Sequence, residues 1–116
     1  MATRERTYTG AELEARLREL GGWAAAGEAI RRIYTTDGWP TTLMLVNAIG
    51  FLAEAADHHP DLTVSWGKVV VQLNTHTAGG VTDKDLELAR RIEALALWRP
   101  EAGGALAGTA KPWVQG

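Results

Sequence analysis

An alternating stretch decides the fold class of this chain: residues 62–75 read LTVSWGKVVVQLNT. Apolar and polar residues alternate from Leu62 to Trp66, and Gly67 then marks a turn. Beyond the turn, one face of the next strand carries Val69, Val71, Leu73 and Thr75. A period of two residues is typical of a β-strand with one buried face. The stretch therefore predicts a β-hairpin whose apolar face packs on helices.

Two helical patterns flank this hairpin. The helix before it is expected from about Pro40 to Asp57, and Pro60 prevents its continuation. The helix after it is expected to open at Thr82 and to fade near Trp98. The apolar stripes are Leu45, Ile49, Leu52 and Ala56 in the first of these helices and Leu88, Ile92 and Leu95 in the second. Spacings of three and four residues place each stripe on one helix face.

The N-terminal part of the chain adds a further helix and a further hairpin. Thr9 and Glu12 have the spacing of a capping box, which favours a helix start. The apolar stripe of this helix is Leu13, Leu17 and Leu20. Residues 23–36 then carry β-propensity on both sides of a break at Gly27. The order α-β-β-α-β-β-α predicts an α+β fold, a four-stranded antiparallel sheet with three helices on one face.

Composition narrows the classes of protein to consider. The chain has 116 residues, a formal net charge of −2 and no cysteine. Its length indicates one domain, which we place at residues 1–98, followed by a Gly- and Ala-rich extension at 99–116. Disulfides and thiolate chemistry are excluded, and the lack of a basic stretch predicts no nucleic-acid partner. No apolar run reaches the ~20 residues of a membrane span, and residues 1–8 do not resemble a signal peptide. We therefore expect a cytoplasmic protein without a membrane partner.

The three histidines of the chain, His58, His59 and His76, are the candidate catalytic residues. Histidine can both give and take a proton near neutral pH. Two such groups that face one substrate can remove a proton and protonate a leaving group in the same pocket. This chemistry requires no metal, no redox cofactor and no covalent nucleophile. We therefore expect no cofactor and no tightly bound metal.

Two carboxylates accompany the histidines. Glu54 precedes His58 by four residues, so both would project from one helix face and could interact if the helix extends that far. Asp85 completes a Thr82-x-x-Asp cap at the start of the third helix. Purely structural or solvated roles stay open for these carboxylates and for each histidine. A zinc site is a further alternative, which the adjacent pair His58–His59 disfavours because neighbouring histidines rarely chelate one ion.

The ordered set of these residues resembles the signature of pterin-4a-carbinolamine dehydratases. The matching elements are Glu54-x-x-x-His58-His59-Pro60, then Trp66, then Thr75-His76, then Gly80-x-Thr82-x-x-Asp85. Each element is weak alone, but the whole ordered set is fairly specific. The similarity covers about residues 9–97. The family fold has helices on one face of a four-stranded antiparallel sheet, which agrees with the order of elements predicted above.

The resemblance implies a lyase that dehydrates 4a-hydroxytetrahydrobiopterin to the quinonoid dihydropterin and so regenerates the cofactor of aromatic amino-acid hydroxylases. By position, His58 and His76 would be the acid–base pair, without an assignment of which is the acid. The residues implied to bind or support the pterin substrate are His59, Glu54, Asp85 and Trp66. The family also implies a homodimer or homotetramer, and the edge strands of the sheet could be covered by another subunit.

The sequence departs from the family pattern at its C-terminal end. Family members usually stop near the third helix, whereas residues 99–116 continue here, bracketed by Trp98 and Trp113. We expect Trp113 to dock by packing and the Gly-rich stretch to be held less firmly. Some relatives assist assembly of the carbon-fixing enzyme RuBisCO in carboxysomes, and others bind protein partners as transcriptional coactivators. The extension therefore favours a protein partner, and a non-catalytic protein-binding module is the alternative function. The intact histidines favour catalysis.

Overall fold

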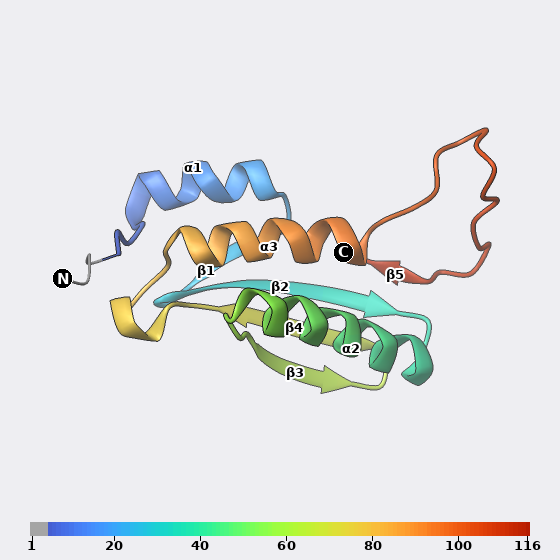
Figure 1. The fold of residues 1–116 in the computed structure, drawn as a ribbon, viewed down its shortest axis with the longest axis horizontal. Coiled ribbons are helices and arrows are strands. Elements are labelled where there is room, and N and C mark those ends of the chain that lie inside the picture. Colours follow the sequence, from blue (N-terminus) through green and yellow to red (C-terminus); the bar gives the residue numbers. More distant parts are fainter. Residues whose placement is uncertain (1–4) are drawn as a thin grey trace.

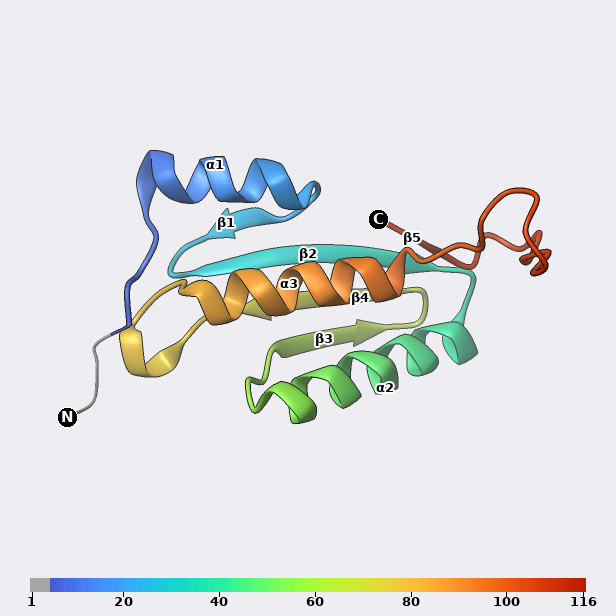
Figure 2. The same cartoon turned by 45° about the horizontal axis from the view of Figure 1, so that its top comes forward.

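An antiparallel sheet and three α-helices make up the computed structural model of the chain, which describes residues 5–116 (Figure 1). The sheet has the strand order β1 (Ala24–Ala26), β2 (Ala29–Thr36), β4 (Lys68–Leu73) and β3 (Asp61–Ser65). The helices are α1 (Gly10–Leu20), α2 (Trp39–Ala56) and α3 (Asp83–Ala96). All three lie on the same face of the sheet (Figure 2). The predicted α+β class and the predicted order of elements are confirmed.

The sheet has a short fifth strand that the sequence did not predict. Strand β5 (Val114–Gln115) pairs antiparallel with the end of β2, at Thr35 and Thr36. Strand β1 pairs with the beginning of β2, and β4 occupies the opposite side of that strand. Strands β1 and β5 therefore share one edge of β2. Arg99 Nη2 donates a hydrogen bond to the carbonyl of Val114 and closes the intervening loop.

The core lies between the sheet and the helices, and the alternation in β4 builds much of it. Val69, Val71 and Leu73 are fully buried, whereas Lys68 and Gln72 on the opposite face are exposed. The helices contribute the fully buried side chains of Ile49 and Ile92. Each such side chain stabilises the fold by about 1.5–3 kcal/mol relative to an exposed one. The predicted inward face of β4 is thus the face that α2 and α3 cover.

A cluster of polar side chains centred on Glu93 links α3 to β2. Arg32 donates from Nε and Nη2 to the two carboxylate oxygens of Glu93, each at 2.9 Å. The hydroxyl of Tyr34 and Nε1 of Trp23 also donate to Glu93 Oε1, at 2.6 and 3.0 Å. Burial alone would raise the pKa of Glu93, but the hydrogen bonds from Arg32 and Tyr34 outweigh it, and the pKa lies below its ordinary value of 4.5. The cluster therefore holds an ionised carboxylate in place between helix and sheet.

The two predicted capping boxes have different outcomes. At α3 the Thr82 side chain accepts from a backbone N–H of the first turn, and Asp85 accepts from Thr82 N at 2.9 Å, so that box is confirmed. At α1 the N-cap residue is Thr9, but its side chain makes no capping hydrogen bond, so that prediction was wrong. Glu12 forms an ion pair with Arg6.

The C-terminal extension is attached through β5. Val114 is 3% exposed and joins the core, while Trp113 is half-buried and packs against it. Residues 101–112 are exposed and form a loop that projects from the fold (Figure 1). Trp98 is 60% exposed, so the firm attachment lies at the far end of the extension. The domain boundary at residue 98 stays a prediction.

Crossing a bilayer requires a long apolar helix, and none of the helices within residues 5–116 has both properties.

Candidate active site

The predicted site residues come from three segments that meet at one end of the molecule. His58 and His59 directly follow α2, His76 opens the short 3-10 helix η1 (His76–Ala78), and Asp85 belongs to the first turn of α3. Figures 1 and 2 show the C-terminal end of α2, the loop with η1 and the N-terminal end of α3 at the same end of the sheet. The antiparallel course of α2 and α3 brings these segments together.

Asp85 is the centre of the site. Its side chain has no exposed surface, and three groups donate hydrogen bonds to it. His58 Nε2 lies 2.6 Å from Oδ1, and Thr75 Oγ1 and Thr82 N lie 2.8 and 2.9 Å from Oδ2. A buried carboxylate needs such partners because desolvation of an unpaired charge is costly. Asp85 thus joins the segment after β4, the start of α3 and the segment after α2 through one side chain.

The direction of each hydrogen bond in this network follows from the donors available. Thr75 Oγ1 donates its hydroxyl proton to Asp85, so in the 2.7 Å contact between the two threonine hydroxyls Thr82 Oγ1 is the donor. Thr82 Oγ1 in turn accepts from the backbone N–H of Lys84. The carboxylate accepts on both oxygens, so His58 Nε2 carries a proton. In neutral His58 the remaining nitrogen, Nδ1, is therefore the one that can accept a proton.

The end of α2 separates the two adjacent histidines. Asp57 has φ of 51°, a left-handed conformation that ends the helix, and His58 N donates to the carbonyl of Ala53 at 3.0 Å. His58 therefore leaves the helix and turns to Asp85. Glu54 pairs with His59 at 2.7 Å on the surface. The predicted pairing of Glu54 with His58 was wrong, because it assumed that the helix continued through Asp57.

His76 lies next in sequence to Thr75, one of the donors to Asp85, and its side chain is exposed. The loop that carries it is closed by a hydrogen bond from Thr75 N to the carbonyl of Gly80, at 2.8 Å. Gly79 has φ of 70°, a left-handed conformation suited to glycine. Among residues 5–116 no hydrogen bond joins His76 to His58 or His59. A common pocket of the three rings remains a prediction.

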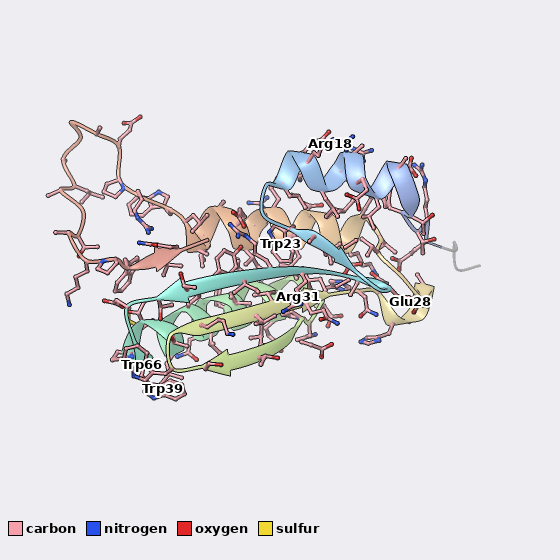
Figure 3. The ribbon with its side chains drawn as sticks, turned by 180° about the vertical axis from the view of Figure 1, so that it is seen from behind. Arg18, Trp23, Glu28, Arg31, Trp39 and Trp66 are labelled. Carbon is pink, nitrogen blue, oxygen red and sulfur yellow. The ribbon has the colours of Figure 1, made fainter. Side chains whose placement is uncertain are left out.

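Trp66 lies far from this cluster. It occupies the turn between β3 and β4, whereas His59 precedes the start of β3. At about 3.3 Å per residue, the strand separates the two ends by roughly 20 Å. The Trp66 ring packs near Gly38. The backbone carbonyl of Trp66 accepts a hydrogen bond from Thr42 Oγ1 at 2.9 Å. Figure 3 shows Trp66 beside Trp39, at the opposite end of the sheet from η1. Within one chain, the five-residue strand β3 separates Trp66 from His59, and a contact of Trp66 with substrate remains a prediction.

A groove of about 390 Å³ runs between α2 and α3 and is bordered by His58. The residues that line it are Leu52, Ala55, Ala56, His58, Lys84, Glu87, Leu88 and Arg91. Lys84 Nζ donates to Glu5 at 2.8 Å, and this hydrogen bond raises the pKa of Lys84 above its ordinary value. Within residues 5–116 no group of three or more histidine, aspartate or glutamate side chains is placed to hold a metal ion.

The sequence analysis did not identify Thr75 and Thr82 as partners of the candidate site. Both are buried, and their hydroxyls form the hydrogen-bond chain that ends on Asp85. Two signals were present in the sequence. Thr75 continues the inward-facing alternation of β4 two residues beyond its end, and Thr82 is the N-cap residue of α3. Neither signal shows that the two hydroxyls share one carboxylate, because that contact depends on how β4 and α3 pack.

Comparison with known proteins identifies the family of this chain. The profile of the pterin 4 alpha carbinolamine dehydratase family matches residues 6–95. This chain belongs to that family. A relative from Roseiflexus sp. (strain RS-1), which carries the pterin-4-alpha-carbinolamine dehydratase name, is 44% identical over 95 residues, 82% of this chain and 99% of its own length. A relative of the same name from Aquifex aeolicus (strain VF5) is 48% identical over 84 residues, 72% of this chain and 85% of its own.

Two solved structures are similar to this fold. The transcriptional coactivator/pterin dehydratase of Brucella melitensis has a TM-score of 0.75 and 33% identity, and the match covers 78% of this chain and 99% of that one. A pterin dehydratase-like protein described as a RuBisCO assembly factor in the α-carboxysome has a TM-score of 0.55 and 18% identity, with 65% and 87% covered. The second likeness shows a shared fold alone. The family match ends at residue 95, so β5 and the extension lie outside it.

Proposed function

We propose that this chain dehydrates a 4a-hydroxytetrahydropterin, such as 4a-hydroxytetrahydrobiopterin, to the quinonoid dihydropterin. The observation that carries the proposal is the contact between His58 and the buried Asp85 in a member of the dehydratase family. A histidine held by a buried carboxylate is oriented for proton transfer, as general acid–base catalysis requires. The product would be returned to the tetrahydropterin cofactor by a separate reduction.

The reaction needs one proton taken and one proton given. The C4a–O bond breaks, the hydroxyl group leaves as water after it gains a proton, and a ring nitrogen loses a proton. His58 would take the proton at Nδ1, because Nε2 donates to Asp85 and the carboxylate stabilises the imidazolium that forms. His76, which is exposed on the neighbouring loop, would protonate the leaving hydroxyl. His59 and Glu54 would hold the pterin.

A direct assay tests this function. The 4a-carbinolamine is generated in solution, and its dehydration is followed by ultraviolet absorbance with and without the protein. The protein should accelerate the loss of water, and the double variant His58→Ala, His76→Ala should lose nearly all of this acceleration. A wild-type rate equal to that in buffer would refute the proposal and leave the non-catalytic protein-binding module as the function. That module is supported only by a shared fold.

The cellular setting is part of the proposal. We place the protein in the cytoplasm, acting on a soluble pterin, as a homodimer or homotetramer. The extension, outside the family match and attached through β5, would be the part that contacts any protein partner. Light scattering of the purified chain, with and without residues 101–116, would measure the oligomeric state and the contribution of the extension to it.

A further inference from the structure

The groove between α2 and α3 is continuous with His58. The His58 side chain is only 12% exposed, and the ring takes part in lining the groove. One wall comes from the last turns of α2, with Leu52, Ala55 and Ala56. The opposite wall comes from α3. A ligand that reaches the accessible edge of His58 therefore has this groove beside it.

The α3 wall gives the groove a direction and a length. Lys84, Leu88 and Arg91 are spaced by four and three residues, so they share one face of the helix. Lys84 is the neighbour of Asp85, the partner of His58, and therefore lies at the histidine end. Seven residues at a rise of 1.5 Å per residue place Arg91 about 10 Å further along the helix. The groove thus leads from His58 to Arg91.

The two positively charged side chains on the α3 wall, Lys84 and Arg91, differ in whether they have an ion-pair partner. The charge of Lys84 is offset by its hydrogen bond with Glu5. Arg91 takes part in no hydrogen bond or ion pair with any residue in the described range 5–116, although Glu87 lies four residues before it. Between the two ends the α2 wall is apolar, with Leu52, Ala55 and Ala56, and the α3 wall contributes Leu88 and the carboxylate of Glu87. A mostly apolar channel therefore ends at a guanidinium group that has no ion-pair partner among residues 5–116.

We propose that this groove binds the side chain of the pterin substrate and that Arg91 selects side chains that end in an oxyanion, phosphate or carboxylate. The inference rests on the proposed dehydratase function and names the class of substrate that this chain prefers. A guanidinium matches both oxyanions because its planar fork donates two parallel hydrogen bonds. The apolar α2 wall fits the carbon chain between the pterin ring and the anion.

Binding of stable analogues tests the groove without the reaction. The probes are three 7,8-dihydropterins with side chains of equal length, which end in a hydroxyl, a carboxylate or a phosphate group. Hydrogen bonds to charged groups contribute about 1.5–3 kcal/mol, so the wild type should bind at least one anionic probe roughly 10- to 100-fold more tightly than the neutral one. The ratio between the carboxylate and phosphate probes then identifies which oxyanion Arg91 favours.

Two variants separate a specific contact from general charge. Arg91→Gln should reduce the preference for the anionic probe to nearly 1, because the fork of donors is lost. Arg90→Gln is the matched control, since it removes the same charge from the adjacent residue, which lines a different pocket beside α1. It should keep the preference. Equal loss in both variants would show general electrostatic attraction and would overturn the role of Arg91.

The dehydration assay distinguishes the two proposals. Dehydration of neutral and anionic substrates with equal kcat/KM by the wild type would overturn the groove inference and leave the dehydratase function in place. The opposite result is also informative. If the wild type prefers the anionic probe, Arg91→Gln abolishes that preference and no substrate is dehydrated, the groove inference is supported and the dehydratase function is refuted. Failure of all three dihydropterins to bind would overturn the groove inference.

Discussion

His58 Nε2 and Asp85 Oδ1 lie 2.6 Å apart, and the Asp85 carboxylate is fully buried at the start of α3. With Asp85 as the ionised acceptor, Nε2 carries the proton, and Nδ1 is the nitrogen that the proposed mechanism uses. We therefore predict that Asp85→Asn lowers kcat by about 100-fold or more and leaves KM nearly unchanged. The side-chain amide of this variant also places an N–H group against the hydrogen-bond donors that surround the carboxylate in the wild type. The resulting unpaired donors should destabilise the fold by about 1–3 kcal/mol. Steady-state kinetics and urea unfolding measure the two effects.

A second variant separates positioning of His58 from general stability. Thr75→Val removes one donor to Asp85 Oδ2 and leaves the His58 contact in place. It should destabilise the fold to a similar extent while kcat falls much less than in Asp85→Asn. Equal losses of kcat in the two variants at equal stability would contradict a special role for the His58 contact.

His76 should matter for turnover and hardly for stability. We predict that His76→Ala lowers kcat by about 100- to 10,000-fold, the usual contribution of an acid–base group. The side chain is exposed and makes no hydrogen bond in the described part of the chain, so the free energy of unfolding should change by no more than about 0.5 kcal/mol. Thr77→Ala, an exposed change in the same turn, is the control for disturbance of η1. Unchanged turnover in His76→Ala would remove His76 from the mechanism.

The contrast between Asp85 and Trp66 shows what the sequence could predict about the site. The capping box of Thr82 and Asp85 is a local feature, so its spacing was enough to predict it correctly. The same carboxylate also binds His58, 27 residues earlier, and that contact depends on the packing of α3 beside the end of α2. Trp66 was grouped with the histidines by motif order, but β3 carries it to the other end of the sheet.

The fold shows the same contrast: local patterns could be predicted from the sequence, and features that depend on a chain reversal or on packing could not. The alternation from Val69 to Leu73 predicted a buried face because burial follows the period of the strand. The apolar stripe of the helix did not predict the left-handed conformation of Asp57. Because the helix ends there, Glu54 contacts His59 and not His58. A strand of two residues such as β5 has no periodicity, so it could be seen only once the edge of β2 was known.

The Glu93 cluster predicts a pH dependence of stability. Because the pKa of Glu93 is below its ordinary value of 4.5 in the folded protein, its contribution to stability is complete above that value and is lost as the pH falls through the folded value. Glu93→Gln should cost about 1.5–3 kcal/mol near pH 7 through weaker hydrogen bonds with Arg32. The difference from wild type should shrink below pH 4.5. Urea unfolding between pH 3 and pH 7, which spans the ordinary value of about 4.3–4.5, measures it.

Glu87→Gln, an exposed change on the same helix, is the control for this series and should stay within about 0.5 kcal/mol of wild type at each pH. A difference between wild type and Glu93→Gln that stays constant across the whole pH range would contradict the assignment. It would mean that the ionisation of Glu93 does not stabilise the fold.

The extension should stabilise the fold through β5 and contribute no catalytic group. Val114 is buried at 3% exposure, so Val114→Ala should lower the free energy of unfolding by about 1–3 kcal/mol. Leu106→Ala is the matched control, because Leu106 is 64% exposed in the projecting loop and its loss should cost no more than about 0.5 kcal/mol. Deletion of residues 101–116 removes β5 altogether and should destabilise at least as much as Val114→Ala. The dehydration rate per folded molecule should stay within a few-fold of wild type, since the residues proposed for catalysis and substrate binding all lie within 54–91. A truncated chain that remains folded, with an unchanged oligomeric state, but cannot dehydrate the carbinolamine would place part of the extension in the active site.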